Sequence, residues 1–183
     1  MSKIGRKPID ISGINVEIKN QEIRYKGPKG SGVYSLSDSF TPTVTSNELK
    51  VVPTKDAQTR LKNRDLNREW GMHRALLSNM LLGSKNEFEK IVEINGLGYK
   101  AAQSGDKLVF TLGYSHKIDF LLPKGVTVSL DKTGQKLTLK SANKELLGEV
   151  CDKICDLRRP EPYKGTGIKV STDIIVRKAG KTK

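Results

Sequence analysis

Apolar and polar residues alternate along most of this chain, which is the pattern of β-strands that bury one face. In the first half the alternation predicts a hairpin over residues 14–27, with Asn20 and Gln21 near its turn, and then three short strands. In the second half it predicts five strands and a closing one. The ranges after the hairpin are 32–37, 41–46, 48–54, 90–102, 107–114, 117–123, 125–131, 136–141 and 167–178.

Two stretches have the apolar spacing of amphipathic helices instead. The first covers residues 65–83 and has a suitable stop at Gly83, while the second covers 143–159 and has a suitable N-cap at Asn143. His73 lies in the first apolar stripe, so we expect a hydrogen-bonded packing residue there. The two stripes contain Leu66, Trp70, His73, Leu77, Met80 and Leu81, and then Leu146, Leu147, Val150, Ile154 and Leu157.

The predicted elements follow the same order in both halves of the chain: a strand, a hairpin and then a helix. This repeat predicts an α+β fold of two tandem similar domains that arose by duplication, each an antiparallel β-sheet packed against a helix. We expect an N-terminal domain over residues 1–83, with a flexible basic arm at its start. A C-terminal domain is expected over 84–175, followed by a basic tail over 176–183.

The net charge of the chain indicates a candidate function for this fold. Its 183 residues carry a formal net charge of +13, which indicates a polyanionic partner. Nucleic acid is the first candidate and an anionic membrane surface is the second. No apolar run approaches the roughly 20 residues of a membrane span, and residues 1–10 lack the apolar core of a secretory signal. We therefore expect a cytoplasmic protein that binds nucleic acid and no membrane.

Two glycine-rich segments fail the tests for cofactor binding. Residues 27–32, GPKGSG, lack the Gly-Lys-Ser/Thr ending of a phosphate-binding loop. Residues 96–101, GLGYKA, are followed by the next predicted strand too soon for the helix of a dinucleotide site. We expect Gly96 and Gly98 to mark a bulge or a close approach within one long strand.

The remaining candidates for chemistry are few. Cys151 and Cys155 lie one helical turn apart at the edge of the second apolar stripe, so we expect reduced thiols that pack against the domain. The two histidines, His73 and His116, are distant from them in sequence and complete no metal-ligand set. We therefore expect no enzyme activity, no cofactor and no metal.

Basic residues gather at the end of the chain around a loop shaped by proline and glycine. From residue 158 to 183, eight lysines and arginines stand against Glu161 and Asp173. The stretch PEPYKGTGIK, residues 160–169, cannot form a regular helix because its prolines lack backbone donors. Lysine and arginine bind phosphates and tyrosine stacks on bases, so this combination predicts an RNA-binding surface. The alternatives are an adaptor with an acidic protein partner and an RNA-modifying enzyme.

Residues 158–168, RRPEPYKGTGI, resemble the C-terminal signature of the large-subunit ribosomal protein six family, bacterial type. Four other stretches resemble that family in the expected order. They are IGRKPI (4–9), YKGPKG (25–30), RALLSNMLLG (74–83) and INGLGYKA (94–101). Thr166 departs from the pattern because the family usually has lysine there, so Lys164 and Lys169 must supply more of the charge.

The resemblance implies a structural constituent of the large ribosomal subunit with two tandem domains of one fold. It implies binding to the large-subunit (23S) rRNA near the GTPase-docking region and the stalk base. The implied partners are large-subunit rRNA and neighbouring large-subunit ribosomal proteins, with transient proximity to translational GTPases.

Our hypothesis is that residues 160–169 clamp RNA. Prolines would fix the shape of the loop, glycines would let its backbone approach RNA, and nearby cations would neutralise phosphates. The tail from Arg177 to Lys183 would be disordered alone and order on RNA. The predicted rRNA-binding residues are Arg158, Arg159, Pro160, Tyr163, Lys164, Gly165, Thr166, Gly167, Lys169, Arg177, Lys178, Lys181 and Lys183, together with Lys3, Arg6 and Lys7 of the N-terminal arm.

Overall fold

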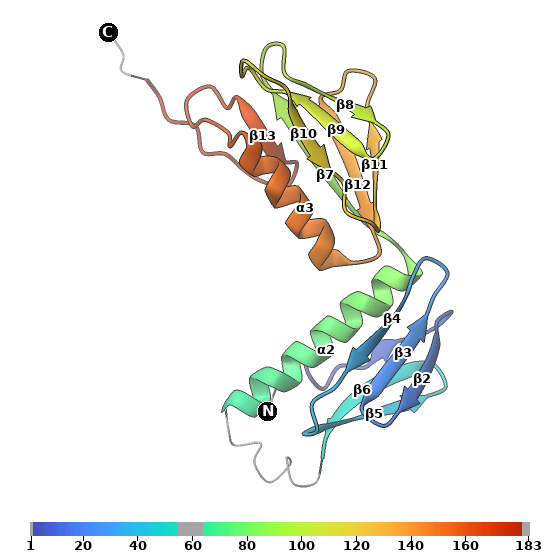
Figure 1. The fold of residues 1–183 in the computed structure, drawn as a ribbon. Helices are drawn as coiled ribbons and strands as arrows, with labels where there is room; N and C mark the ends of the chain where they lie inside the picture. Colours follow the sequence, from blue (N-terminus) through green and yellow to red (C-terminus); the bar gives the residue numbers. More distant parts are fainter. Residues whose placement is uncertain (1, 55–63, 181–183) are drawn as a thin grey trace. The chain divides into compact units, whose positions relative to one another are not determined.

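A computed structural model describes residues 2–54 and 64–180 of the chain. The chain divides into two compact units, Met1–Glu87 and Phe88–Lys183. Each unit pairs antiparallel sheets with one long helix (Figure 1). This arrangement confirms the predicted α+β class. Neither helix of the described residues has the length and apolar content of a membrane span.

The first unit contains two three-stranded antiparallel sheets, ordered β2-β3-β4 and β1-β6-β5, and the helix α2. The β2–β3 hairpin turns at Asn20 and Gln21 as predicted, with Lys19 opposite Glu22. Asn20 takes a φ of 54°, a left-handed conformation that asparagine tolerates. The elements are β1 (Ile9–Asp10), β2 (Asn15–Lys19), β3 (Glu22–Lys26), β4 (Ser31–Ser35), β5 (Phe40–Thr45), β6 (Glu48–Pro53) and α2 (Arg64–Lys85).

Helix α2 covers the core of the first unit with its predicted apolar stripe. Leu77 and Leu81 are fully buried, and Trp70 is nearly so. The indole N–H of Trp70 donates to the carbonyl of Val51 over 2.8 Å, which satisfies its one polar atom. These contacts fix the helix to strand β6.

The C-terminal end of α2 lies beyond the predicted stop, Gly83, because the helix continues to Lys85. Its last turn packs against the turn between β3 and β4. The amide of Lys29 donates to the carbonyl of Ser84 over 2.9 Å, and a Cβ at Gly27 would lie 2.4 Å from that same oxygen. The glycine-rich segment 27–32 therefore serves helix packing, because Gly27 allows the close approach.

The N-terminal arm is held against α2, so the expectation that it is flexible is wrong. The amide of Ser2 donates to Oδ1 of Asn67 over 3.0 Å, and the guanidinium of Arg74 donates to the carbonyl oxygens of Lys7 and Pro8. Gly5 lies so close to the Trp70 ring that a Cβ there would come within 2.5 Å of it. Hydrogen bonds between residues more than sixty positions apart in the sequence thus hold the arm in place.

The second unit contains one three-stranded sheet, β10-β9-β8, and one four-stranded sheet, β11-β12-β7-β13, both antiparallel. Its helix α3 packs on strands β7, β12 and β13. The elements are β7 (Phe88–Asn95), β8 (Lys100–Ser104), β9 (Lys107–Thr111), β10 (Ile118–Leu121), β11 (Val126–Leu130), β12 (Lys136–Ser141), α3 (Lys144–Leu157) and β13 (Gly167–Val170).

The two units have the same order of elements. In each, one strand of the helix-covered sheet comes first, a three-stranded meander follows, and a hairpin then returns to pair with that first strand before the helix. The second unit adds β13, which follows α3 and pairs with β7. The segment between α3 and β13 therefore has no counterpart in the first unit.

Helix α3 begins as the sequence predicts. The side chain of Asn143 accepts hydrogen bonds from the amides of Glu145 and Leu146, which is the N-cap geometry. Cys151 is fully buried in the core, whereas the sequence placed it at the edge of the apolar stripe. Burial is the largest cause that raises the pKa of the Cys155 thiol to about 11, so both cysteines serve packing as free thiols.

The segment from 90 to 102 is two strands and not the single long strand that its alternation predicts. Strand β7 ends at Asn95, and β8 begins at Lys100 in the other sheet. Gly96 has a φ of 154° and Gly98 a φ of 76°, which allow the chain to turn between the sheets. The prediction of a bulge or close approach within one strand is therefore wrong. A Cβ on Gly96 would meet the Tyr99 ring at 2.5 Å within the turn, whereas nothing lies within 4 Å of one on Gly98.

His73 is a hydrogen-bonded packing residue, as predicted. Its Nδ1 lies 2.6 Å from the hydroxyl of Tyr34, and its ring packs 5.5 Å from that of Phe40. Burial lowers the pKa of His73 below the ordinary value of 6.5, with a smaller opposing effect of Glu69. The folded unit therefore favours the neutral ring.

We expect the first unit to lose stability as pH falls through 6.5, because the unfolded chain then binds a proton that the folded His73 resists. Above that value this contribution to stability is fully present. Urea unfolding followed by fluorescence of Trp70, the single tryptophan, measures the effect in this unit. His73→Gln should flatten the dependence between about pH 7.5 and pH 5, and an unchanged slope in that variant would contradict the assignment.

Candidate nucleic-acid interface

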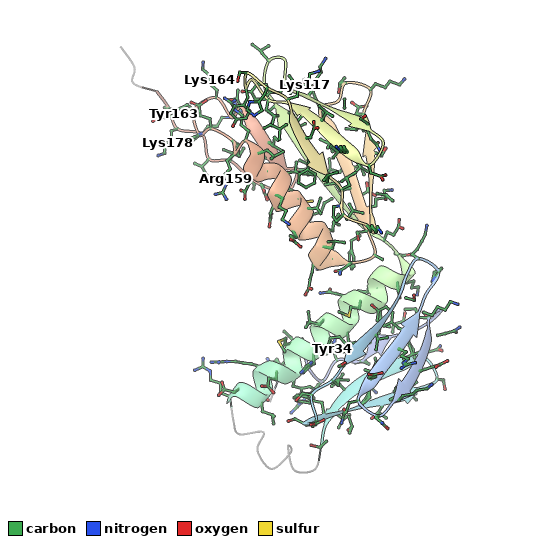
Figure 2. The ribbon with its side chains drawn as sticks, in the orientation of Figure 1. Tyr34, Lys117, Arg159, Tyr163, Lys164 and Lys178 are labelled. Carbon is green, nitrogen blue, oxygen red and sulfur yellow. The ribbon has the colours of Figure 1, made fainter. Side chains whose placement is uncertain are left out.

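The predicted binding stretch forms the connection between α3 and β13, which we call the α3–β13 loop (residues 158–166) (Figure 2). Helix α3 stops at Leu157, and Arg158 takes an extended conformation with φ −157° and ψ 94°. Pro160 follows two residues after this C-cap, a common place for proline because it cannot continue a helix. The chain then loops out and returns as β13.

Backbone hydrogen bonds close this loop on itself. At its base, the amide of Ile168 donates to the carbonyl of Arg158 over 2.8 Å. Further out, the amide of Glu161 donates to the carbonyl of Thr166, and that of Gly165 donates to the carbonyl of Glu161, each over 2.9 Å. The Thr166 hydroxyl also donates to Glu161 over 3.3 Å. The loop thus has a fixed shape without any partner.

Gly165 in the loop and Gly167 at the start of β13 serve the closure of the loop, whereas the sequence suggested that they let the backbone approach RNA. Both are buried. Gly165 has a φ of 74°, and Gly167 has a φ of 142°. A Cβ on Gly167 would lie 2.6 Å from Cα of Pro160 and 2.7 Å from the carbonyl oxygen of Arg159. Glycine is required there because the two sides of the loop touch.

The tip of the loop presents an aromatic ring beside a cation. The side chain of Tyr163 is exposed, at 55% of its full accessible area, and Lys164 is exposed beside it. Figure 2 shows Tyr163, Lys164 and Lys178 in the same region of the second unit. Among residues 2–54 and 64–180, no carboxylate forms an ion pair with either lysine. Both amino groups are therefore available to an anionic partner.

The tail beyond β13 returns to this tip, so the prediction of a tail without structure of its own is wrong for its first residues. The amide of Lys178 donates to the carbonyl of Pro162 over 3.0 Å. The guanidinium of Arg177 lies against Gly165, where a Cβ would meet it at 3.2 Å. Lys181 and Lys183 lie outside the described residues.

Arg158 points into the second unit and holds two of its loops together. Its guanidinium packs over the rings of Tyr99 and Tyr114, at 5.2 and 4.9 Å from their centroids. Its Nη1 donates to the carbonyl of Leu112 over 2.6 Å. This arrangement gives Arg158 a structural role, because its guanidinium is held between two rings and bonded to a backbone carbonyl of its own unit.

Arg159 and Lys169 both have carboxylate partners. Arg159 pairs with Asp156 at 2.7 Å, and Lys169 pairs with Glu93 at 3.4 Å where both side chains are about three-quarters buried. Both cations also line a pocket of about 400 Å³ that contains the carboxylates of Asp152 and Asp173. Their positive charge is largely offset on this side of the loop.

The three cations of the N-terminal arm belong to the first unit. Lys3, Arg6 and Lys7 are exposed on the segment that α2 holds in place. They are not part of the α3–β13 loop, so the structure divides the predicted site between two units.

Sequence reasoning missed a second exposed segment, the β9–β10 loop (residues 112–117). It carries Tyr114, His116 and Lys117, all of which are exposed. The signal was present as GYSHK, an aromatic and basic run after an alternating strand. In the described part of the chain, no group of three or more metal-binding side chains occurs.

Comparisons with known proteins agree on one family. The family model described as Ribosomal protein L6 matches residues 95–171. Three similar curated proteins, each named large ribosomal subunit protein uL6, come from Geobacter metallireducens, Ruegeria pomeroyi and Bartonella quintana. They are 44%, 39% and 39% identical to this chain, and each alignment covers 100% of the chain and 98%, 100% and 100% of the relative.

We expect Gly167→Ala to destabilise the second unit by roughly 1–3 kcal/mol, because the new methyl group meets the backbone of Arg159 and Pro160 at a strained φ. Gly148→Ala in α3 is the matched control. Nothing lies within 4 Å of its Cβ, so alanine should stabilise the helix by about 0.5–1 kcal/mol. Urea unfolding followed by far-UV circular dichroism measures both changes, and equal effects of the two substitutions would refute the role of Gly167.

Proposed function

The chain belongs to the ribosomal protein L6 family, and from this membership we propose that the α3–β13 loop is a principal contact of the protein with large-subunit rRNA. The family resemblance of residues 158–168 is thereby confirmed. As a member of the family the protein is a structural constituent of the large ribosomal subunit and not an enzyme. It associates with the subunit and its rRNA in the cytoplasm, as bacterial large subunits do.

The single observation that supports this contact is the tip of the loop, where the exposed ring of Tyr163 lies beside the unpaired lysine Lys164. An unstacked base can stack on an exposed tyrosine, and a neighbouring phosphate can meet an adjacent ammonium group. Because backbone hydrogen bonds already fix the loop, little conformational entropy is lost when RNA binds.

The geometry supports a narrower contact than the full set of basic residues. Tyr163, Lys164, Arg177 and Lys178 form the outward tip, whereas Arg159 and Lys169 face carboxylates. Phosphates approach poorly over a surface that contains Asp152, Asp156 and Asp173. We therefore place the RNA at the tip and assign Arg158, Gly165 and Gly167 to the shape of the loop.

The finer placement follows the family resemblance. We propose that the rRNA contact lies in 23S rRNA near the region where translational GTPases dock and near the stalk base. Neighbouring large-subunit proteins would then lie close to the second unit. The exposed cations Lys3, Arg6 and Lys7 would give the first unit a separate contact with the same RNA. An adaptor with an acidic protein partner is the competing function.

We expect Tyr163→Ala to weaken binding to a full-length 23S rRNA transcript by about tenfold, because a stacking partner is lost. Tyr163→Phe keeps the ring and should bind like the unsubstituted protein. Lys164→Ala should reduce the slope of log K against log salt by about 0.7–0.9, the value of one phosphate contact. Filter binding between roughly 50 and 200 mM salt measures all three.

The controls are Lys124→Ala, an exposed lysine remote from the loop, and a 16S rRNA transcript as an unrelated structured RNA. A preference for 23S rRNA that persists at the higher salt is expected. Equal affinity for both transcripts, falling together with salt, would mean nonspecific charge only. In that case the rRNA contact at the loop is refuted, and the adaptor function gains support.

Thr166→Lys provides a test of charge at the loop, because it introduces the lysine that the family usually has. We expect the salt slope to become steeper by about 0.7–0.9 if phosphates lie at the tip. Thr166→Val removes only the hydroxyl that contacts Glu161 and should leave the slope unchanged. An identical slope in the two variants would place residue 166 away from the RNA backbone.

A further inference from the structure

Three loops lie at one end of the second unit, because strand pairing aligns the strand ends from which they leave. Gly167 of β13 pairs with Asn95 at the end of β7. Lys100 at the start of β8 pairs with Thr111 at the end of β9, and Ile118 of β10 pairs with Phe110. The turn after β7, the β9–β10 loop and the α3–β13 loop therefore share this end.

The β9–β10 loop is fixed to the base of the α3–β13 loop by a reciprocal pair of hydrogen bonds. Arg158 donates from Nη1 to the carbonyl of Leu112 over 2.6 Å, and the hydroxyl of Tyr114 donates to the carbonyl of Leu157 over 3.1 Å. The guanidinium packs on the Tyr114 ring between these two bonds. A partner bound at one loop consequently meets the other at a fixed spacing.

The β9–β10 loop exposes the same chemistry as the tip of the α3–β13 loop. The rings of Tyr114 and His116 stack with centroids 6.2 Å apart and planes inclined by 23°. Lys117 follows them directly and is exposed, and it forms no ion pair with any of the residues that the structure describes. Figure 2 shows Lys117 at the end of the unit where Lys164 lies.

We propose that the β9–β10 loop is a second contact for the same rRNA. In this contact the Tyr114–His116 pair stacks on an unpaired base, and Lys117 binds a phosphate of the same strand. Arg158 is the positioning residue that holds this contact at a fixed distance from the tip of the α3–β13 loop. The proposal rests on the proposed rRNA binding and adds a second site to it.

RNA fits this loop better than an acidic protein surface does. An acidic surface would engage Lys117 alone and would make no use of the exposed ring surface of Tyr114 and His116. A nucleotide uses both parts, because its base stacks on the rings while its phosphate reaches the cation. Gly113, before Tyr114, has a φ of 74°, and a Cβ there would lie 2.9 Å from the Tyr99 ring, so glycine allows the β9–β10 loop to lie against Tyr99.

The test compares two double variants of the full chain in binding to the 23S rRNA transcript. The first variant is His116→Ala with Lys117→Ala. The second is the charge control, Lys107→Ala with Lys124→Ala, at the opposite end of the β9–β10 hairpin, where Lys107 pairs with Leu121. We expect the first to weaken binding by about tenfold and to reduce the salt slope by about 0.7–0.9. The control should bind like the unsubstituted protein.

The outcomes separate this proposal from the function on which it rests. If the first variant binds normally while Tyr163→Ala and Lys164→Ala bind weakly, the second contact is refuted and the loop contact stands. If the unsubstituted protein shows no preference for 23S rRNA, the proposed function itself fails. Equal losses in the two double variants would show general charge attraction and would also overturn the second contact.

A double-mutant cycle tests the positioning role of Arg158. Arg158→Lys keeps the positive charge but loses the planar group that packs on Tyr114 and bonds to Leu112. In that background, removal of the Lys117 side chain should weaken rRNA binding by a much smaller factor than in the unsubstituted chain. An equal factor in both backgrounds would show that Arg158 stabilises the fold without positioning the second contact.

Discussion

The second unit depends on the placement of one guanidinium group, that of Arg158. This group leaves the end of α3, enters the space between two tyrosine rings and donates to a carbonyl at the end of β9. An arginine is suited to this position, because its plane stacks on rings while its edge donates hydrogen bonds. The end of the helix, two loops and the turn after β7 are thereby tied to one side chain. A basic residue in an RNA-binding protein can thus act inside the protein and shape the surface that other cations use.

Basic residues of the second unit differ in whether a carboxylate lies beside them, so the positive charge that remains exposed is not spread evenly over the surface. Carboxylates on α3 and β7 hold Arg159 and Lys169, while the tip of the loop keeps its lysines without partners. An ion pair at an exposed site contributes little to stability, but it removes a charge from the field that a phosphate meets. The net charge of +13 is therefore not a measure of any one surface, because carboxylates pair with part of the positive charge while the lysines at the tip have no such partners among the residues that the structure describes.

Much of this fold was predictable from sequence, because binary pattern and capping act locally. The alternation of apolar residues located nearly every strand, and Asn143 located the start of α3. The pattern failed where a non-local contact decides the structure. Residues 90–102 were read as one strand, yet their apolar positions change from Val92 and Ile94 to Leu97 and Tyr99, and the chain enters a second sheet at Gly96 and Gly98. Gly83 does not end α2, because the last turn of that helix packs on the turn at Gly27.

The candidate site shows the same limit. Sequence identified the α3–β13 loop because proline, glycine and basic residues are concentrated in it. It could not show that Gly167 faces Pro160, or that Lys169 pairs with Glu93, which lies far from it in the chain. The β9–β10 loop was missed because its residues gain significance only beside Arg158, a neighbour in space and not in sequence.

The pairing of β13 with β7 has a consequence for the order in which the protein is made. Strand β7 is the first element of its unit and β13 is the last, so the four-stranded sheet is complete only when residue 170 is available. During synthesis β7 must therefore wait, without one of its two neighbours, until the last strand of its unit is made. The loop between α3 and β13 acquires its shape in this final step. A chain that stops before β13, or that fails to close this sheet, therefore cannot display the loop, so the loop marks a second unit whose sheet is complete.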